Sequence, residues 1–181
     1  MSENWIVTLG VFDGVHRGHI ALLKRLAEVA AEKSARSLVI TFTQHPMEVL
    51  EPSCYGGFIQ PLHERISTIQ SLGIDQVACL DFSREFANLS AEDFLQYIYK
   101  QYPFSGLVLG YDTAFGRNKE GGRELISTLA DQWGVYLEYV LPVLWKGAPI
   151  STTRIREALR SNFQEDVCEM LGRANLHFNP Y

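Results

Sequence analysis

The amino-acid sequence predicts an α/β protein with a Rossmann-like, five-stranded parallel sheet flanked by helices. Two observations support this prediction. Short apolar runs alternate along the chain with longer segments whose apolar residues recur at helical spacing. Polar or glycine-rich segments follow the ends of several of these runs. Strands separated by helices favour right-handed crossovers, and such sheets bind ligands beyond the carboxyl ends of their strands.

The elements expected in the first half of the chain are bounded by turn signals. An apolar strand at 5–9 precedes a glycine-rich turn, and an amphipathic helix follows at 20–33. A second strand, 37–43, ends before Pro46, because the residue before a proline is pushed toward extended geometry. A loop rich in proline and glycine comes next. Further elements are then expected: a helix at 61–72 and a strand at 75–80.

The second half continues the alternation. Ser90 begins a helix as a capping residue, and strands are expected at 107–109 and 135–141, separated by a helix at 120–133. Ser151 caps a helix that runs to about Arg160. The last expected helix covers 164–171. The chain has 181 residues, without internal repeats, and this length suits one domain.

Composition narrows the classes of function. The net charge of −5 disfavours a general nucleic-acid binder, which is usually basic. Local cationic clusters suit a small anionic ligand instead; they are Arg117, Lys119 and Arg123, and Arg154, Arg156 and Arg160. The three cysteines are widely spaced, which argues against a disulfide framework or a zinc site. No run reaches transmembrane length and no signal peptide is apparent, so we expect a cytoplasmic protein without membrane partners.

The turn at 10–19 carries the clearest chemical pattern. It joins a strand to a helix, where backbone N–H groups and the positive end of the helix dipole bind phosphate. Gly18 lets a phosphate approach the backbone, and His16 and His19 share one side if both lie in the first turn. Such a pair could stabilise the charge that develops in phosphate transfer. The alternative is a surface or capping role for the two histidines.

A second helix N-terminus, at 150–156, has a similar character. Three hydroxyl side chains and two arginines follow Ile150, and they could bind phosphate oxygens. A plain helix cap with surface arginines is the alternative. The sequence contains none of the patterns GxxxxGK[ST], GxGxxG or GxSxG, and no cysteine has a neighbouring histidine that indicates a thiol nucleophile.

These segments resemble a known superfamily. The pattern from Gly10 to His19, together with Ile-Ser-Thr-Thr-Arg-Ile-Arg at 150–156, is similar to the HxGH and ISSTxxR signatures of nucleotidylyltransferases. Within this superfamily, the chain most resembles the N-terminal FMN adenylyltransferase module of bacterial FAD synthetase, because of three further segments: 41–46, 110–116 and 171–173. This resemblance covers nearly the whole chain and implies the nucleotidylyltransferase type of Rossmann-like fold.

The resemblance implies a reaction and a set of site residues. FMN and ATP would give FAD and pyrophosphate, with Mg²⁺. The catalytic residues would be His16, His19 and Arg156. The residues that bind ATP would be Gly10, Phe12, Asp13, Gly14, Gly18, Ser151, Thr152, Thr153 and Arg154. The residues that border the flavin would be His45, Pro46, Asp112 and Phe115. Core packing is the alternative for Phe115, as a turn-forming role is for Asp112, and the metal ligands are not identified.

Some features depart from the family pattern. Gln44 replaces a usual proline and Thr113 a usual phenylalanine, which affects the flavin site more than the ATP site. The family commonly continues into a riboflavin kinase module, so we expect a domain at 1–173 and, at 174–181, a tail where that module would begin. A related nucleotidylyltransferase with another phosphorylated acceptor, and a non-catalytic flavin- or nucleotide-binding module, are the alternatives. Whether Tyr55, Phe58 and Phe86 serve packing or a partner surface stays open.

Overall fold

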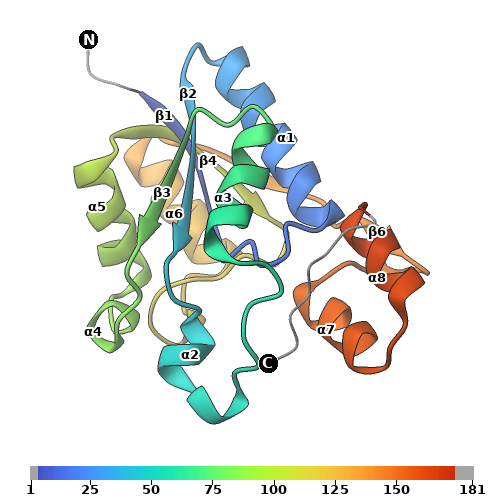
Figure 1. Ribbon diagram of the computed structural model, residues 1–181. Helices are drawn as coiled ribbons and strands as arrows, with labels where there is room; N and C mark the ends of the chain where they lie inside the picture. The colour runs from blue at the N-terminus through green and yellow to red at the C-terminus, as the bar shows by residue number, and fades with distance from the viewer. Residues whose placement is uncertain (1–3, 174–181) are drawn as a thin grey trace.

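The computed structural model describes residues 4–173. Five parallel strands form one sheet in the order β3-β2-β1-β4-β5 (Figure 1). The strands are β1 (Trp5–Leu9), β2 (Arg36–Phe42), β3 (Gln76–Leu80), β4 (Phe104–Gly110) and β5 (Tyr136–Val140). The predicted fold class is confirmed, since every expected strand overlaps one of these. The predicted tail, 174–181, lies outside the described residues.

Helices cover both faces of the sheet. They are α1 (Arg17–Glu32), α3 (Leu62–Ser71), α5 (Ala91–Gln101) and α6 (Arg123–Trp133). Successive side chains of a strand point to opposite faces, so the sheet has two separate cores. Trp5 of β1 packs in the core under α5 and α6, whereas Ile6 packs in the core under α1 and α3. All five residues of β1 are buried, as expected for the central strand of a parallel sheet.

The C-terminal part of the described chain forms a third, smaller core. It contains α7 (Thr152–Arg160), α8 (Gln164–Leu171) and a hairpin of β6 (Leu144–Trp145) with β7 (Ala148–Pro149). Ile155 and Leu171 are fully buried there, together with Ile59 from the long loop. The two helices, orange to red in Figure 1, lie to one side of the sheet. This small core holds the start of α7 near the turn after β1.

Some element boundaries were predicted wrongly. The first helix begins at Arg17 rather than residue 20, because His16 caps it. Helix α6 begins at Arg123 rather than residue 120, because Gly121 exchanges backbone hydrogen bonds with Phe115 and Gly122 has an extended backbone. The prediction omitted β6, β7 and four short elements: α2 (Pro46–Leu50), α4 (Arg84–Ala87) and the 3-10 turns η1 (Pro52–Cys54) and η2 (Arg117–Lys119).

The strand order creates a natural binding position. The chain leaves β1 toward β2 and β3 on one side, then crosses to β4 and β5 on the other. A crevice forms where the connections diverge, beyond the carboxyl ends of the neighbouring strands β1 and β4. The turn at 10–16 and the loop at 111–121 follow these two strands. Within residues 4–173, no helix is long and apolar enough to cross a membrane.

Candidate active site

A cavity of about 1060 Å³ lies at this edge of the sheet. Most of the predicted site residues line it: Gly10, Phe12, Asp13, His16, Gly18, His19, His45, Pro46, Asp112, Phe115, Ser151, Thr152 and Thr153. Gly14, Arg154 and Arg156 do not line it. We call the turn 10–16 and the starts of α1 and α7 the inner end of the cavity. We call segments 82–88 and 111–119, which line its opposite side, the outer wall.

The two histidines of the inner end form a stacked pair. Their ring centroids are 3.6 Å apart with an interplanar angle of 14°. His16 is the N-cap of α1, and its Nδ1 accepts a hydrogen bond from the His19 backbone N–H at 3.2 Å. Burial lowers the pKa of His16 to about 4, and burial together with His16 holds the pKa of His19 well below its usual value. Both rings are therefore neutral near pH 7.

The turn that carries this pair has a strained backbone. Phe12 and Val15, at φ 52° and 36°, adopt left-handed conformations that β-branched and bulky side chains rarely accept. Gly18 is required for close approach, because a Cβ there would lie 3.1 Å from the His16 ring. Backbone strain of this kind is typical of functional sites. The Nδ1 atom of His19 is buried and, within the described residues, has no hydrogen-bond partner.

Asp13 connects three segments of the inner end. Its carboxylate, 1% exposed, accepts hydrogen bonds from the backbone N–H groups of Ile59 and Gln60. It also pairs with Arg156, whose Nη2 lies 2.6 Å from Oδ2. Arg156, predicted to bind phosphate, is therefore held by an internal acid, and its Nη1 donates to the carbonyl of Gly56 at 3.4 Å.

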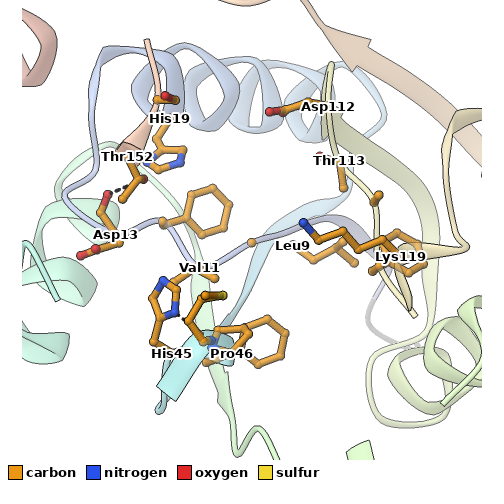
Figure 2. Close-up of a pocket in the computed structure, with 18 of the residues that line it drawn as sticks. Leu9, Val11, Asp13, His19, His45, Pro46, Asp112, Thr113, Lys119 and Thr152 are labelled. Atoms are coloured by element: carbon orange, nitrogen blue, oxygen red, sulfur yellow. Dashed lines mark hydrogen bonds between the residues drawn. The ribbon is translucent and has the colours of Figure 1, made fainter. Parts of the chain in front are cut away.

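The start of α7 adjoins the same turn. Ser151 caps the helix by accepting from the Arg154 backbone N–H, and the Thr152 hydroxyl donates to the Asp13 carbonyl (Figure 2). The guanidinium of Arg154 donates to the carbonyls of Trp145, Ala148 and Pro149. Arg154 therefore fixes the β6–β7 hairpin to the helix, which explains its position away from the cavity.

Arg173 stabilises the turn at the inner end through hydrogen bonds. Its guanidinium donates to the backbone carbonyls of Gly14 and Val15. Leu171 packs close to Gly14 as well, since a Cβ at Gly14 would lie 3.4 Å from it. The segment 171–173 was identified in the sequence, but its function as a clamp on the turn was not predicted. Only the three-dimensional contact of residues far apart in sequence reveals it.

Aromatic side chains dominate the outer wall. Phe86 packs against Phe82 and Phe94, with centroid distances of 5.9 Å and 5.5 Å, and Phe94 lies 5.0 Å from Phe115. Phe115 thus both packs on the core and lines the cavity, so its two interpretations are compatible. Phe86 belongs to this wall as well. Asp112 lies at the rim and is exposed.

His45 borders the cavity from the end of β2. It caps α2 by accepting from the Met47 backbone N–H, and its ring stacks on Tyr55 at 5.1 Å. Phe58 contacts both rings. Tyr55 and Phe58 therefore serve packing within this chain. Of the two departures from the family pattern, Thr113 lines the cavity, whereas Gln44 is exposed outside it.

Sequence reasoning missed one buried cation beside the site. Arg65 is fully buried, donates to the Phe42 carbonyl at 2.7 Å and stacks over Phe58. Burial lowers its pKa, while the charge of Asp13 opposes that shift. An arginine at a helical core position resembles a surface residue in sequence, so no pattern could have predicted its burial.

Residues 4–173 contain no group of three or more histidine, cysteine, aspartate or glutamate side chains placed to hold a metal ion. Asp13, the buried carboxylate at the inner end, is already paired with Arg156. The side chains described here therefore do not fit a dedicated metal cage. Magnesium often binds through substrate phosphates and only one or two protein carboxylates.

Comparison with known protein families identifies the family of this chain. The family model described as FAD synthetase matches residues 1–154. The chain belongs to the FAD synthetase family.

Curated relatives of this FAD synthetase family member carry the name bifunctional riboflavin kinase/FMN adenylyltransferase. The Escherichia coli K12 protein is 32% identical over 159 residues, which are 87% of this chain and 51% of the relative. The Buchnera aphidicola protein from Acyrthosiphon pisum is 29% identical over 174 residues, 96% of this chain and 56% of the relative. The chain thus spans about half the length of the curated relatives that it matches.

A solved structure agrees with this fold. The crystal structure titled as a macrolide-efflux protein from Streptococcus pneumoniae has a TM-score of 0.84 and 30% sequence identity. The similarity covers 95% of this chain and 56% of that one. The FAD synthetase family member and this structure therefore share the whole domain described above.

Proposed function

We propose that this domain transfers AMP from ATP to FMN, giving FAD and pyrophosphate. The observation that carries the proposal is the stacked pair of His16 and His19 at the N-terminus of α1, facing a cavity with an aromatic opposite wall. One end suits a polyphosphate and the other a flat ring system. ATP and FMN together have both features, and family membership supports the same substrates.

The reaction needs positioning more than acid–base chemistry. The phosphate of FMN is largely a dianion near neutral pH, since its second pKa is about 6. One of its oxygens attacks the α-phosphorus of ATP in line, a new P–O bond forms, and the bond to the β-phosphate oxygen breaks as pyrophosphate leaves. No strong base is required. The domain supplies orientation and charge stabilisation.

The inner end supplies the charge stabilisation. His16 and His19 are neutral without ligand, and the negative charge of a triphosphate favours a proton on the pair. The amides at the start of α1 and the hydroxyls of Ser151, Thr152 and Thr153 complete the phosphate site. Magnesium would arrive with ATP, because the described side chains form no metal cage. Arg156 could contact phosphate only by leaving Asp13, so its role stays a prediction.

The wider assignment follows from the family. We assign residues 1–173 to the FMN adenylyltransferase module and propose that a riboflavin kinase module or a separate kinase supplies FMN. The curated relatives named for both activities support that partner. A cytoplasmic location, predicted from the sequence, remains part of the proposal.

The test is formation of FAD. The purified chain would be incubated with FMN, ATP and magnesium, and the flavins separated by chromatography. We expect FAD from the parent chain and a roughly hundredfold lower rate from His16→Asn, about 3 kcal/mol of transition-state stabilisation. Asparagine keeps a capping oxygen for α1. His63→Asn, at an exposed position, is the control.

Two outcomes would overturn this function. Adenylylation of another phosphorylated acceptor, without FAD, would indicate a related nucleotidylyltransferase. Binding of ATP and FMN without any product would indicate a binding module. Unchanged FAD formation in His16→Asn would leave the reaction but remove the histidine pair from it.

A further inference from the structure

The loop at 111–121, which follows β4, is anchored firmly beside the cavity. Phe115 and Gly121 exchange backbone hydrogen bonds, and the Arg117 N–H donates to the Leu89 carbonyl at 2.7 Å. Gly116 has φ +79°, and a Cβ there would lie 2.6 Å from the backbone nitrogen of Ala91. The loop is therefore docked against the start of α5 with no space for larger residues.

The backbone of this loop is strained at its tip. Asn118 and Lys119, neither of them glycine, have φ values of 54° and 58°. Consecutive left-handed residues are unfavourable for L-amino acids, and strain of this kind concentrates at functional sites. Figure 2 shows the result of this geometry: the Lys119 side chain extends from the loop toward the middle of the cavity.

The charge of Lys119 is not balanced by the protein. The adjacent acid, Glu120, uses one carboxylate oxygen to accept from the Ala91 N–H at 3.2 Å, and the other lies 3.9 Å from Arg117. Within residues 4–173, the Lys119 side chain has no hydrogen bond and no salt bridge. An exposed ammonium inside a ligand cavity, without an acid of its own, favours an anionic ligand group.

The surroundings of Lys119 indicate which kind of anionic ligand it binds. Its loop belongs to the outer wall, which Phe115 also lines, and its side chain extends toward the middle of the cavity, between the aromatic wall and the histidine pair that suits the triphosphate (Figure 2). A ligand that packs a flat ring on the aromatic wall and carries a phosphate fits this position. Building on the proposed function, we propose that Lys119 binds the phosphate of FMN and is the residue that distinguishes FMN from riboflavin.

The experiment compares two flavins that differ only in the phosphate. FMN and riboflavin are titrated into the chain, and binding is followed by flavin fluorescence. We expect the parent chain to bind FMN more tightly than riboflavin. In Lys119→Met the affinity for FMN falls roughly fivefold, the upper end for an exposed ion pair, and that for riboflavin is unchanged. Lys119→Arg retains most of the preference, and Lys24→Met, exposed on α1, is the control.

Steady-state kinetics give a second measurement. We expect Lys119→Met to raise the KM for FMN and to leave the KM for ATP unchanged. Equal loss of affinity for both flavins would mean a structural role and overturn the proposal. A raised KM for ATP, with unchanged flavin binding, would assign Lys119 to the triphosphate instead.

The two proposals fail in distinguishable ways. A parent chain that makes FAD, with a Lys119→Met variant that keeps its preference for FMN, overturns the assignment of Lys119 alone. A parent chain that binds neither flavin overturns the function, and the assignment with it.

Discussion

The inner end and the outer wall of the cavity are built on opposite principles. At the inner end, several charged side chains bond to other parts of the protein: Asp13 pairs with Arg156, and Arg173 donates to the carbonyls of Gly14 and Val15. At the outer wall, Lys119 projects without an acidic partner among the described residues. The turn at the inner end is largely buried, whereas the wall is more exposed.

This difference separates architecture from ligand contact. Several residues of the family signatures, such as Asp13, Arg154 and Arg156, bind other parts of the protein in this structure. They hold the histidine pair and the helix N-termini in place before any ligand arrives. Preorganised groups of this kind stabilise developing charge without reorganising during the reaction. Substitutions at the inner end should therefore affect stability and activity together, and those at the wall should affect ligand choice.

The largest effect is expected at Asp13. In Asp13→Asn the Arg156 guanidinium loses its counter-charge, and two backbone N–H groups lose a charged acceptor. Breaking a buried ion pair from one side costs about 3 kcal/mol or more. We expect urea denaturation to give a free energy of unfolding lower by about that amount. Asp131→Asn, an exposed control, should change it by less than about 0.5 kcal/mol. A loss at Asp13 no greater than that of the control would contradict its role in connecting the segments of the inner end.

A change of pH should also weaken the inner end. The pKa of His16 is about 4 in the folded protein and 6.5 as a free side chain. The unfolded chain therefore binds more protons between these values, so stability is lost as the pH falls from 6.5 toward 4. Between pH 7.5 and 5 the loss is about 2 kcal/mol for this group.

The matched variant isolates this contribution. Carboxylates with lowered pKa values, such as Asp75, also lose stability in acid, but they do so equally in His16→Asn. Urea unfolding at both pH values should show a smaller pH dependence in the variant than in the parent chain. If the free energy of unfolding changed with pH equally in the variant and in the parent chain, His16 would not be buried in its neutral form.

A smaller effect is expected from the clamp on the turn. Arg173→Met leaves the Gly14 and Val15 carbonyls without their donors but keeps the apolar stem. We expect a loss of about 1.5 kcal/mol of stability and roughly a tenfold lower rate of FAD formation, because the turn that carries His16 loosens. Arg160→Met on α7 is the control. A stable variant with a normal rate would remove the clamp from the mechanism.

Sequence patterns predicted the scaffold better than the site. The strands could be predicted, because β1 and β2 are continuous apolar runs and a parallel sheet buries both faces. The phosphate-binding turn could be predicted as well, from glycines between a strand and a helix. The pairing of Asp13 with Arg156 could not be predicted. The two residues are distant in sequence, and they meet only because of the way in which α7 docks against the turn. The left-handed conformation of residues 118 and 119 could not be predicted either, because it depends on the packing of Gly116 and Gly121 against α5.

The smallest expected effect lies beside the outer wall, at Gly122. It is the N-cap of α6, has φ −80°, lacks a side-chain cap and has open space around its Cβ position. Gly122→Ser adds a capping oxygen and restricts the unfolded chain, so we expect about 0.5 kcal/mol of added stability and unchanged FAD formation. The adjacent Gly121→Ala is the opposite control, because its Cβ would lie 2.6 Å from that of Ala91. If Gly122→Ser instead lowered the rate, the outer wall would be coupled to the chemistry as tightly as the inner end, and the contrast between the two regions would fail.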